Sequence, residues 1–269
     1  MDGDALSLLL PPRSAQPDRS AGISMLAASA APNTPPRLLE VSGLTKRYGD
    51  ETALADVGFT VNAGEVLGLI GPNGAGKTTL LEAMAGVLPA NSGALLWRGK
   101  NLPPARRREA MFYLPDGVRP YPEQPVARVL EFFAGVYRRS DAQVAEAIAT
   151  LGLAPSLDKR VQALSKGYAR RLMLALGWLA PHPVLLMDEP FDGFDLRQTR
   201  HIAQALRRAA SEGRTLVLAI HQLADAERVC DRFVLLADGR VRGTGTLAEL
   251  RARACRPAAS LEEIFLALT

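Results

Sequence analysis

Four acidic side chains lie within the ten residues of LMDEPFDGFD, residues 186–195, directly after the apolar run VLLM. Asp188 and Glu189 are adjacent, so on an extended strand their side chains would point to opposite faces. One carboxylate could bind a metal ion while the other accepts a proton. The alternative is a solvated turn at the end of a buried strand.

A second stretch that could carry a chemical function is GPNGAGKTT, residues 71–79, which fits the pattern G-x-x-x-x-G-K-[ST]. It stands between an apolar run of strand length and a helical pattern, the context that this motif requires. Glycines let backbone N–H groups surround phosphate oxygens, and a helix N-terminus adds a positive dipole. The cradle consists of Gly71, Pro72, Asn73, Gly74, Ala75, Gly76, Lys77, Thr78 and Thr79.

The cradle assigns roles to the two acids. We expect Lys77 to reach the β- and γ-phosphates of a nucleotide and the Thr78 hydroxyl to ligate magnesium. In such a P-loop fold, an aspartate that ends a second apolar strand holds the same magnesium, and Asp188 has that place. Glu189 would then direct its carboxylate at a water in line with the γ-phosphate. A glycine-rich turn with a chance lysine is the alternative, and the scarcity of lysine, five in the chain, disfavours it.

Hydrophobic patterning indicates the elements that position these residues. Strand patterns alternate with helical ones, which predicts an α/β fold with a mostly parallel sheet covered on both faces. The two strands nearest the N-terminus are separated by little chain and are expected to pair antiparallel. Between about residues 116 and 165 the strand patterns stop, which predicts a helical insertion. The expected strands are 38–44, 53–61, 64–71, 93–99, 110–116, 184–189 and 215–221, and the expected helices are 77–87, 126–138, 141–152, 166–180 and 196–210.

Helix ends carry their own signals. Asp141 is the expected N-cap of the helix 141–152. Thr246 with Glu249, and Ser260 with Glu263, each fit a capping box that opens a C-terminal helix.

The composition limits the classes of protein to which this chain can belong. With 48% apolar and 22% charged residues, the 269-residue chain can form a substantial core. Uninterrupted apolar stretches stay below the eighteen residues that would suggest a membrane span. Cys230 and Cys255 form no CxxC pair, which fits a reducing cytoplasm. The net charge of +4 is too mild to indicate an acidic partner such as nucleic acid.

Residues 1–36 are rich in proline, alanine and serine and lack a lasting periodicity, which predicts a disordered extension. The short apolar run LSLLL is too short for a secretory signal, and Met25 is an alternative start of translation. The folded domain is expected to span residues 37–269.

Beyond the cradle, LSKGY at residues 164–168 precedes a helical pattern and the strand that ends at Asp188. Over about residues 38–269, this order of motifs resembles the ATP-binding subunits of ABC transporters. LSKGY is similar to the family's LSGGQ signature and keeps its leucine, serine and second glycine. The resemblance implies the ABC ATPase architecture: a P-loop core, an N-terminal antiparallel β part and a helical insertion. It also implies ATP and Mg²⁺ as cofactors and ATP hydrolysis as the reaction.

The resemblance implies roles for five further residues. Ser165 and Gly167 would bind the γ-phosphate of ATP held by the opposite subunit, although helix capping alone would also explain the serine. FDGFD resembles the D-loop, which places Asp195 at a dimer interface. His221 resembles the switch histidine that senses the γ-phosphate and orients the attacking water. Tyr48 resembles the aromatic residue that stacks on adenine, with packing at a strand edge as the alternative.

Three positions depart from the family pattern. The family usually has a glutamine after YLP that links magnesium to the helical domain, and in this chain the residue is Asp116. An aspartate can still ligate magnesium, although it is shorter and adds charge. An ordinary turn residue ahead of Gly117 is the alternative. In the signature, Lys166 replaces a glycine and Tyr168 replaces the glutamine. These two changes bear on the rate of ATP hydrolysis and on how hydrolysis is coupled to transport.

Other nucleotide-binding classes fit less well. A GTPase would carry an N-K-x-D motif, which is absent, and a nucleotide kinase lacks the signature and the late histidine. A binding module without catalysis is disfavoured because Glu189 and His221 are both present. The ending SLEEIFLALT resembles exporter-type ATPases.

The sequence therefore predicts the ATPase of an ABC exporter, paired with a second copy or a homologous ATPase subunit. We expect it to dock on separate transmembrane permease subunits at the inner face of the cytoplasmic membrane, without nucleic acid. The runner-up is a soluble, non-transport ABC ATPase in an assembly or nucleic-acid process.

Overall fold

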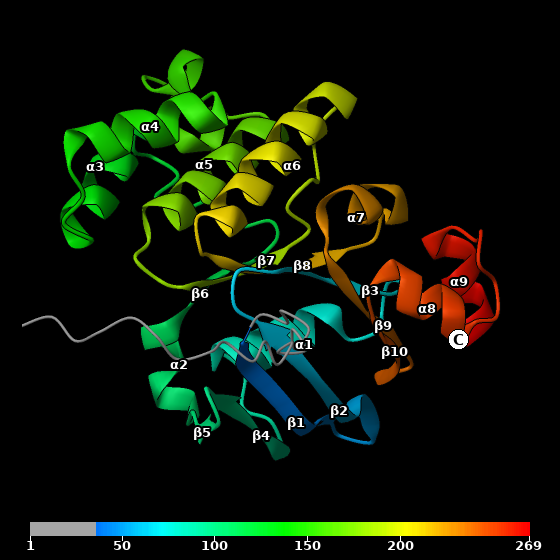
Figure 1. The fold of residues 1–269 in the computed structure, drawn as a ribbon. Coiled ribbons are helices and arrows are strands. Elements are labelled where there is room, and N and C mark those ends of the chain that lie inside the picture. Colours follow the sequence, from blue (N-terminus) through cyan, green and yellow to red (C-terminus); the bar gives the residue numbers. More distant parts are fainter. Residues whose placement is uncertain (1–35) are drawn as a thin grey trace, which may run out of the picture. The chain divides into compact units, whose positions relative to one another are not determined.

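Two strands of twelve residues, β1 and β2, form an antiparallel pair in which Val41 lies opposite Phe59. The computed structural model describes residues 36–269 (Figure 1). Residues 1–35, for which the sequence predicts disorder, lie outside the described residues. On its other edge β1 pairs antiparallel with β4, so this sheet has the order β2-β1-β4-β5. The expected antiparallel part is therefore confirmed.

The second sheet has the strand order β10-β9-β3-β8-β7-β6 and positions the site. Its neighbours from β9 to β6 pair in parallel, while β10 pairs antiparallel with β9. The residues of β3, β7 and β8 are all buried, as expected for parallel strands covered on both faces. The predicted α/β fold class is confirmed.

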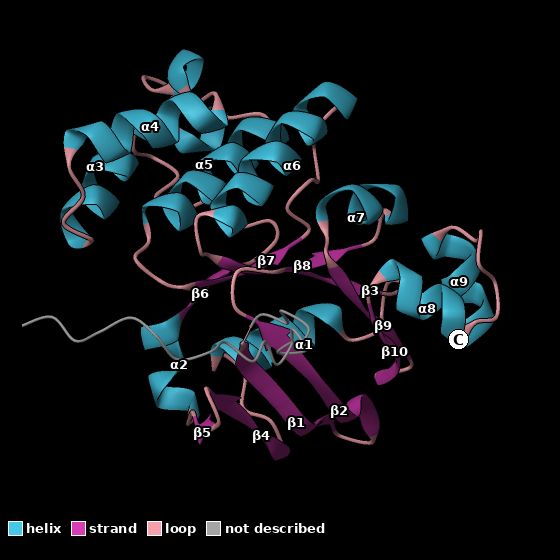
Figure 2. Cartoon of the chain, viewed as in Figure 1, coloured by secondary structure: helices cyan, strands magenta, loops and turns pink. Residues whose placement is uncertain are grey.

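Strands and helices alternate along most of residues 36–269 (Figure 2). The strands are β1 (Arg37–Tyr48), β2 (Glu51–Asn62), β3 (Val66–Ile70), β4 (Ser92–Trp97), β5 (Lys100–Asn101), β6 (Met111–Leu114), β7 (Val184–Asp188), β8 (Thr215–Ile220), β9 (Arg232–Ala237) and β10 (Arg240–Gly245). The helices are α1 (Lys77–Ala85), α2 (Pro104–Ala110), α3 (Val126–Val136), α4 (Asp141–Leu151), α5 (Lys166–Leu179), α6 (Leu196–Ser211), α7 (Leu223–Val229), α8 (Leu247–Arg253) and α9 (Leu261–Leu268), with 3₁₀ turns at Ala154–Ser156 and Val161–Ala163.

Helices cover both faces of the second sheet. Helices α3 to α5 follow one another between β6 and β7, and Figure 1 shows them with α6 on one face of the sheet, while α1 lies between the two sheets. Within residues 36–269, no helix is long and apolar enough to cross a membrane.

Successive side chains of β7 pack into two different apolar clusters, so the core has two parts. Leu185 and Met187 belong to the apolar cluster shared with α5 and α6. Val184 and Leu186 belong to the cluster shared with α1 and the antiparallel sheet. Because successive side chains of a strand point to opposite faces, one buried strand stabilises both layers and holds its carboxyl end rigidly between them.

Three helix caps were predicted from the sequence; two of them are formed as predicted and one is not. The two C-terminal capping boxes are formed as predicted, at Thr246 and Ser260. The prediction of Asp141 as an N-cap is wrong: Ser140 caps α4, and its hydroxyl accepts a hydrogen bond from the backbone N–H of Gln143. The Gln143 side chain completes the capping box, so Asp141 becomes the first helical residue, where its charge suits the helix dipole.

Candidate functional site

Residues 71–76 of the cradle form the loop between β3 and α1, and residues 77–79 begin α1. The shape of the loop depends on glycine. Gly74 and Gly76 have φ values of 82° and 99°, in the left-handed region that favours glycine. A Cβ atom on Gly76 would lie 2.6 Å from the backbone oxygen of Ala53 in β2. The loop is therefore pressed against the antiparallel sheet at the residue that precedes Lys77.

This geometry predicts a stability difference between two glycine variants. Gly76→Ala is expected to lower the free energy of unfolding by at least ~1 kcal/mol more than Gly99→Ala. Gly99 is the matched control, because its φ is 78° and nothing lies within 4 Å of the position of its Cβ. Urea unfolding of the full chain without nucleotide measures both values. Equal losses would show that the contact with Ala53 carries no energy.

Lys77 begins α1 and is nearly buried at the floor of the cradle. Its ammonium group donates to the backbone oxygens of Gly71, at 2.8 Å, and Pro72, at 3.1 Å. Burial lowers the pKa of Lys77, whereas the nearby carboxylates of Glu189 and Asp188 act to raise it. The ammonium group is thus held in the cradle by two backbone carbonyl groups, and two nearby carboxylates favour its charged form.

The two expected magnesium ligands lie in contact. The Thr78 hydroxyl donates to Oδ2 of Asp188 at 2.6 Å, which joins α1 to the end of β7. The pKa of Asp188 is raised, chiefly by burial, and the Thr78 hydrogen bond opposes that shift. The described residues contain no group of three or more His, Cys, Asp or Glu side chains that could hold a metal alone. A hydroxyl and a carboxylate instead suit Mg²⁺, a hard cation that takes its remaining ligands from phosphate and water.

Glu189 and His221 form the second pair. Nδ1 of His221 lies 2.6 Å from Oε2 of Glu189, so the ring can donate to this carboxylate. Glu189 is not part of the strand: β7 ends at Asp188, and Glu189 has a left-handed φ of 49°. The strand alternation suggested by the sequence, which would place the two acids on opposite faces, therefore does not extend to Glu189. A non-glycine residue in this region is strained, and such residues cluster at functional sites.

One cavity of about 730 Å³ unites most of these residues. Tyr48 lies at its wall, half-exposed, with the ammonium of Lys46 5.0 Å from its ring centroid. Asp238 and Gly239, in the turn between β9 and β10, also line it and were not predicted. The signal was present, because an Asp-Gly pair between apolar stretches is typical of a β-hairpin. The cavity is lined by Tyr48, Glu51, Thr52, Ala53, Asn73, Gly74, Gly76, Lys77, Thr78, Thr79, Asp116, Asp188, Glu189, Asp238 and Gly239.

The signature residues lie elsewhere. Ser165 caps α5, and its hydroxyl accepts from the backbone N–H of Tyr168, so the capping alternative is realised. Gly167 packs against the FDGFD loop, where a Cβ would lie 2.9 Å from the Gly193 oxygen. Asp195 caps α6. Ser165, Gly167 and Asp195 are absent from the described residues that line the cavity.

Asp116 lines the cavity, but its carboxylate forms an ion pair with Arg170 of α5. No local pattern in the sequence singles out this arginine, because the two residues are 54 positions apart. The other two histidines bind backbone oxygens: His182 contacts Arg108 and His201 contacts Thr150.

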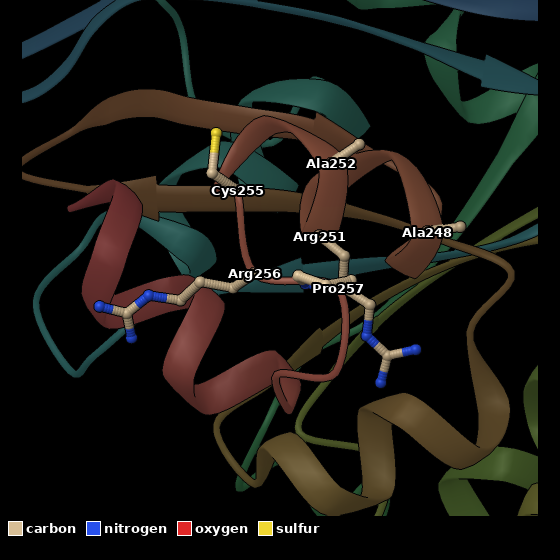
Figure 3. Close-up of a pocket in the computed structure, with 6 residues that line it drawn as sticks. All are labelled: Ala248, Arg251, Ala252, Cys255, Arg256 and Pro257. Atoms are coloured by element: carbon tan, nitrogen blue, oxygen red, sulfur yellow. The ribbon is translucent and has the colours of Figure 1, made fainter.

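A separate pocket is lined by α8 and by the segment that connects α8 to α9 (Figure 3). It contains none of the residues that the sequence motifs indicate. Its lining residues are Ala248, Arg251, Ala252, Cys255, Arg256 and Pro257.

Comparison with known proteins gives a consistent picture. A family model described as ABC transporter matches residues 54–192. A solved structure titled "Structure of ATP binding subunit of ABC transporter" superposes with a TM-score of 0.78 at 32% identity and covers 86% of this chain and 99% of its own.

Curated relatives extend this similarity beyond the residues matched by the family model. ABC-type transporter ATP-binding protein EcsA of Bacillus subtilis (strain 168) is 32% identical over 86% of this chain and 96% of its own length. Nod factor export ATP-binding protein I of Ralstonia nicotianae is 34% identical over 79% of this chain and 68% of its own. Fe(3+) ions import ATP-binding protein FbpC of Streptomyces coelicolor is 37% identical over 80% of this chain and 64% of its own. The relatives thus include proteins named for export and for import.

Proposed function

The chain belongs to the ATP-binding proteins of the ABC transporter family, and from this premise we propose that it is the ATPase subunit of an exporter whose membrane-spanning part is formed by separate chains. The observation that carries the proposal is the cavity in which the cradle, the magnesium-side pair and Glu189 meet. The C-terminal resemblance to exporter-type ATPases and the similarity to a Nod factor export protein support export. The similarity to FbpC, an import protein, leaves the direction as a proposal.

The residues that the sequence motifs indicate have distinct tasks in this proposal. Lys77 and the backbone of the cradle bind the β- and γ-phosphates of ATP. Magnesium, when bound by Thr78 Oγ1 and the Asp188 carboxylate, would neutralise negative charge on those phosphates. Glu189 accepts a proton from the attacking water, and the His221 ring, 2.6 Å away, orients that carboxylate. Tyr48 is positioned at the cavity wall for adenine.

The position of the signature supports a dimer as the working unit. Among the described residues that line the chain's own cavity, Ser165 and Gly167 are absent. A serine that caps a helix, and the N-terminus of that helix, can nevertheless bind phosphate. We propose that they complete the site of a second ATPase subunit, and that Asp195 lies near the interface. The pair would act peripherally at the cytoplasmic face of the membrane.

Co-purification separates this proposal from a soluble, non-transport role. We expect the full-length tagged chain, extracted from its native membranes in detergent, to retain in stoichiometric amount a chain with about six apolar spans of ~20 residues. Mass spectrometry identifies the partner, and extraction without detergent is the control. A stoichiometric partner that lacks such spans, or a bound nucleic acid, would favour the runner-up.

A further inference from the structure

Arg170 is a buried arginine at the boundary between the helical insertion and the catalytic cavity. Its side chain is only 6% exposed. One guanidinium nitrogen donates to the backbone oxygens of Asp188, at 3.2 Å, and Pro115, at 3.4 Å. The other forms the ion pair with the Asp116 carboxylate. The planar fork of arginine lets a single side chain hold several acceptors in a fixed arrangement.

The groups held by Arg170 belong to the site already described. Asp188 supplies the carboxylate that contacts Thr78, and its carbonyl precedes Glu189 in the strained turn. Asp116 lines the same cavity as Asp188 and Glu189. Without the arginine, Asp116 would be an uncompensated anion beside two other carboxylates.

Helix α5 begins within the signature, residues 164–168. Arg170 lies four residues after Lys166, so both side chains lie on one face of α5. Lys166 forms an ion pair of 2.5 Å with Asp192 in the loop that follows β7. Helix α5 thus contacts the loop after β6 through Arg170 and the loop after β7 through Lys166.

We propose that Arg170 is a positioning residue for ATP hydrolysis, which places the Asp116 carboxylate and the Asp188 main chain relative to the cradle and ties both to the signature helix. It acts through these two residues and need not touch ATP. A shift of α5, as when the signature engages a second subunit, would reach the cavity through this side chain. The proposal rests on the ATPase activity of the chain but assigns a residue that the family resemblance did not.

A double-mutant cycle on the full chain tests this coupling. Arg170→Gln is expected to lower kcat for Mg-ATP about 10-fold, because the Asp116 carboxylate and the Asp188 main chain lose the group that holds them. Asp116→Asn is expected to lower kcat about 3- to 10-fold, and the double variant to be no slower than Arg170→Gln alone, since both substitutions break the same ion pair. KM for ATP should change by less than about 2-fold in all three variants, because the cradle contacts are intact.

The control is another buried arginine without a role at the cavity. Arg107 of α2 is 4% exposed and donates to the backbone oxygens of Leu102 and Ala83. Arg107→Gln should lower the thermal midpoint while kcat per folded molecule stays at the wild-type value. This separates positioning from stability alone.

Two outcomes would overturn the assignment: additive effects of the two substitutions, or a folded Arg170→Gln variant with wild-type kcat. If Arg170→Gln does not fold, Arg170→Lys replaces it in the cycle under the same criterion, because lysine keeps the charge but loses the fork. A wild-type chain that fails to hydrolyse Mg-ATP would instead count against the proposed function.

Discussion

Glu189→Gln is expected to lower the rate of ATP hydrolysis about 100-fold or more while ATP binding persists. Glutamine keeps the size of the side chain but cannot accept a proton from water. The Glu189 carboxylate contacts His221 at 2.6 Å and is not part of the cradle. Phosphate release at saturating Mg-ATP measures turnover, and calorimetry at equilibrium measures affinity.

The same variant should accumulate as an ATP-bound dimer, because binding continues while the step that ends it is blocked. Size-exclusion chromatography with Mg-ATP detects the dimer. Glu109→Gln is the control, since Glu109 is exposed and pairs only with Arg106 on α2 among the described ion pairs. Near-wild-type hydrolysis by Glu189→Gln would mean that another group accepts the proton.

Lys77→Ala is expected to weaken ATP binding about 10- to 100-fold and to abolish measurable hydrolysis, since a charge-assisted contact to phosphate is worth about 1.5–3 kcal/mol. The ammonium group is already held at the loop by the oxygens of Gly71 and Pro72, so little reorganisation is required to bind phosphate. Titration with ATP and magnesium measures the affinity.

Lys100→Ala is the control for this variant, because Lys100 is an exposed residue of β5 outside the cavity. Thermal unfolding without nucleotide shows whether Lys77→Ala remains folded. Unchanged ATP affinity in a folded Lys77→Ala protein would show that the backbone of the cradle binds the phosphates without this side chain.

Contiguous motifs were predictable because their geometry is local. Residues 71–76 form the expected loop between a strand and a helix and residues 77–79 begin the helix, since glycine conformations and the start of a helix are set by neighbouring residues. Asp188 ends its strand as predicted because the apolar run before it is buried on both faces. The sequence predicts Asp141 as the N-cap of a helix, whereas Ser140 is the N-cap in the structure. The ends of helices and strands are therefore predicted less accurately than their types.

The sequence by itself therefore determined the fold class, the cradle and the acids at the end of β7. Only the tertiary structure decided that Arg170 neutralises Asp116 and that the turn at Asp238 reaches the cavity. The physical reason is the same in each case. A strand or loop pattern depends on neighbouring residues, whereas contacts across 54 positions depend on the order in which the strands pair and on how the helices pack over them.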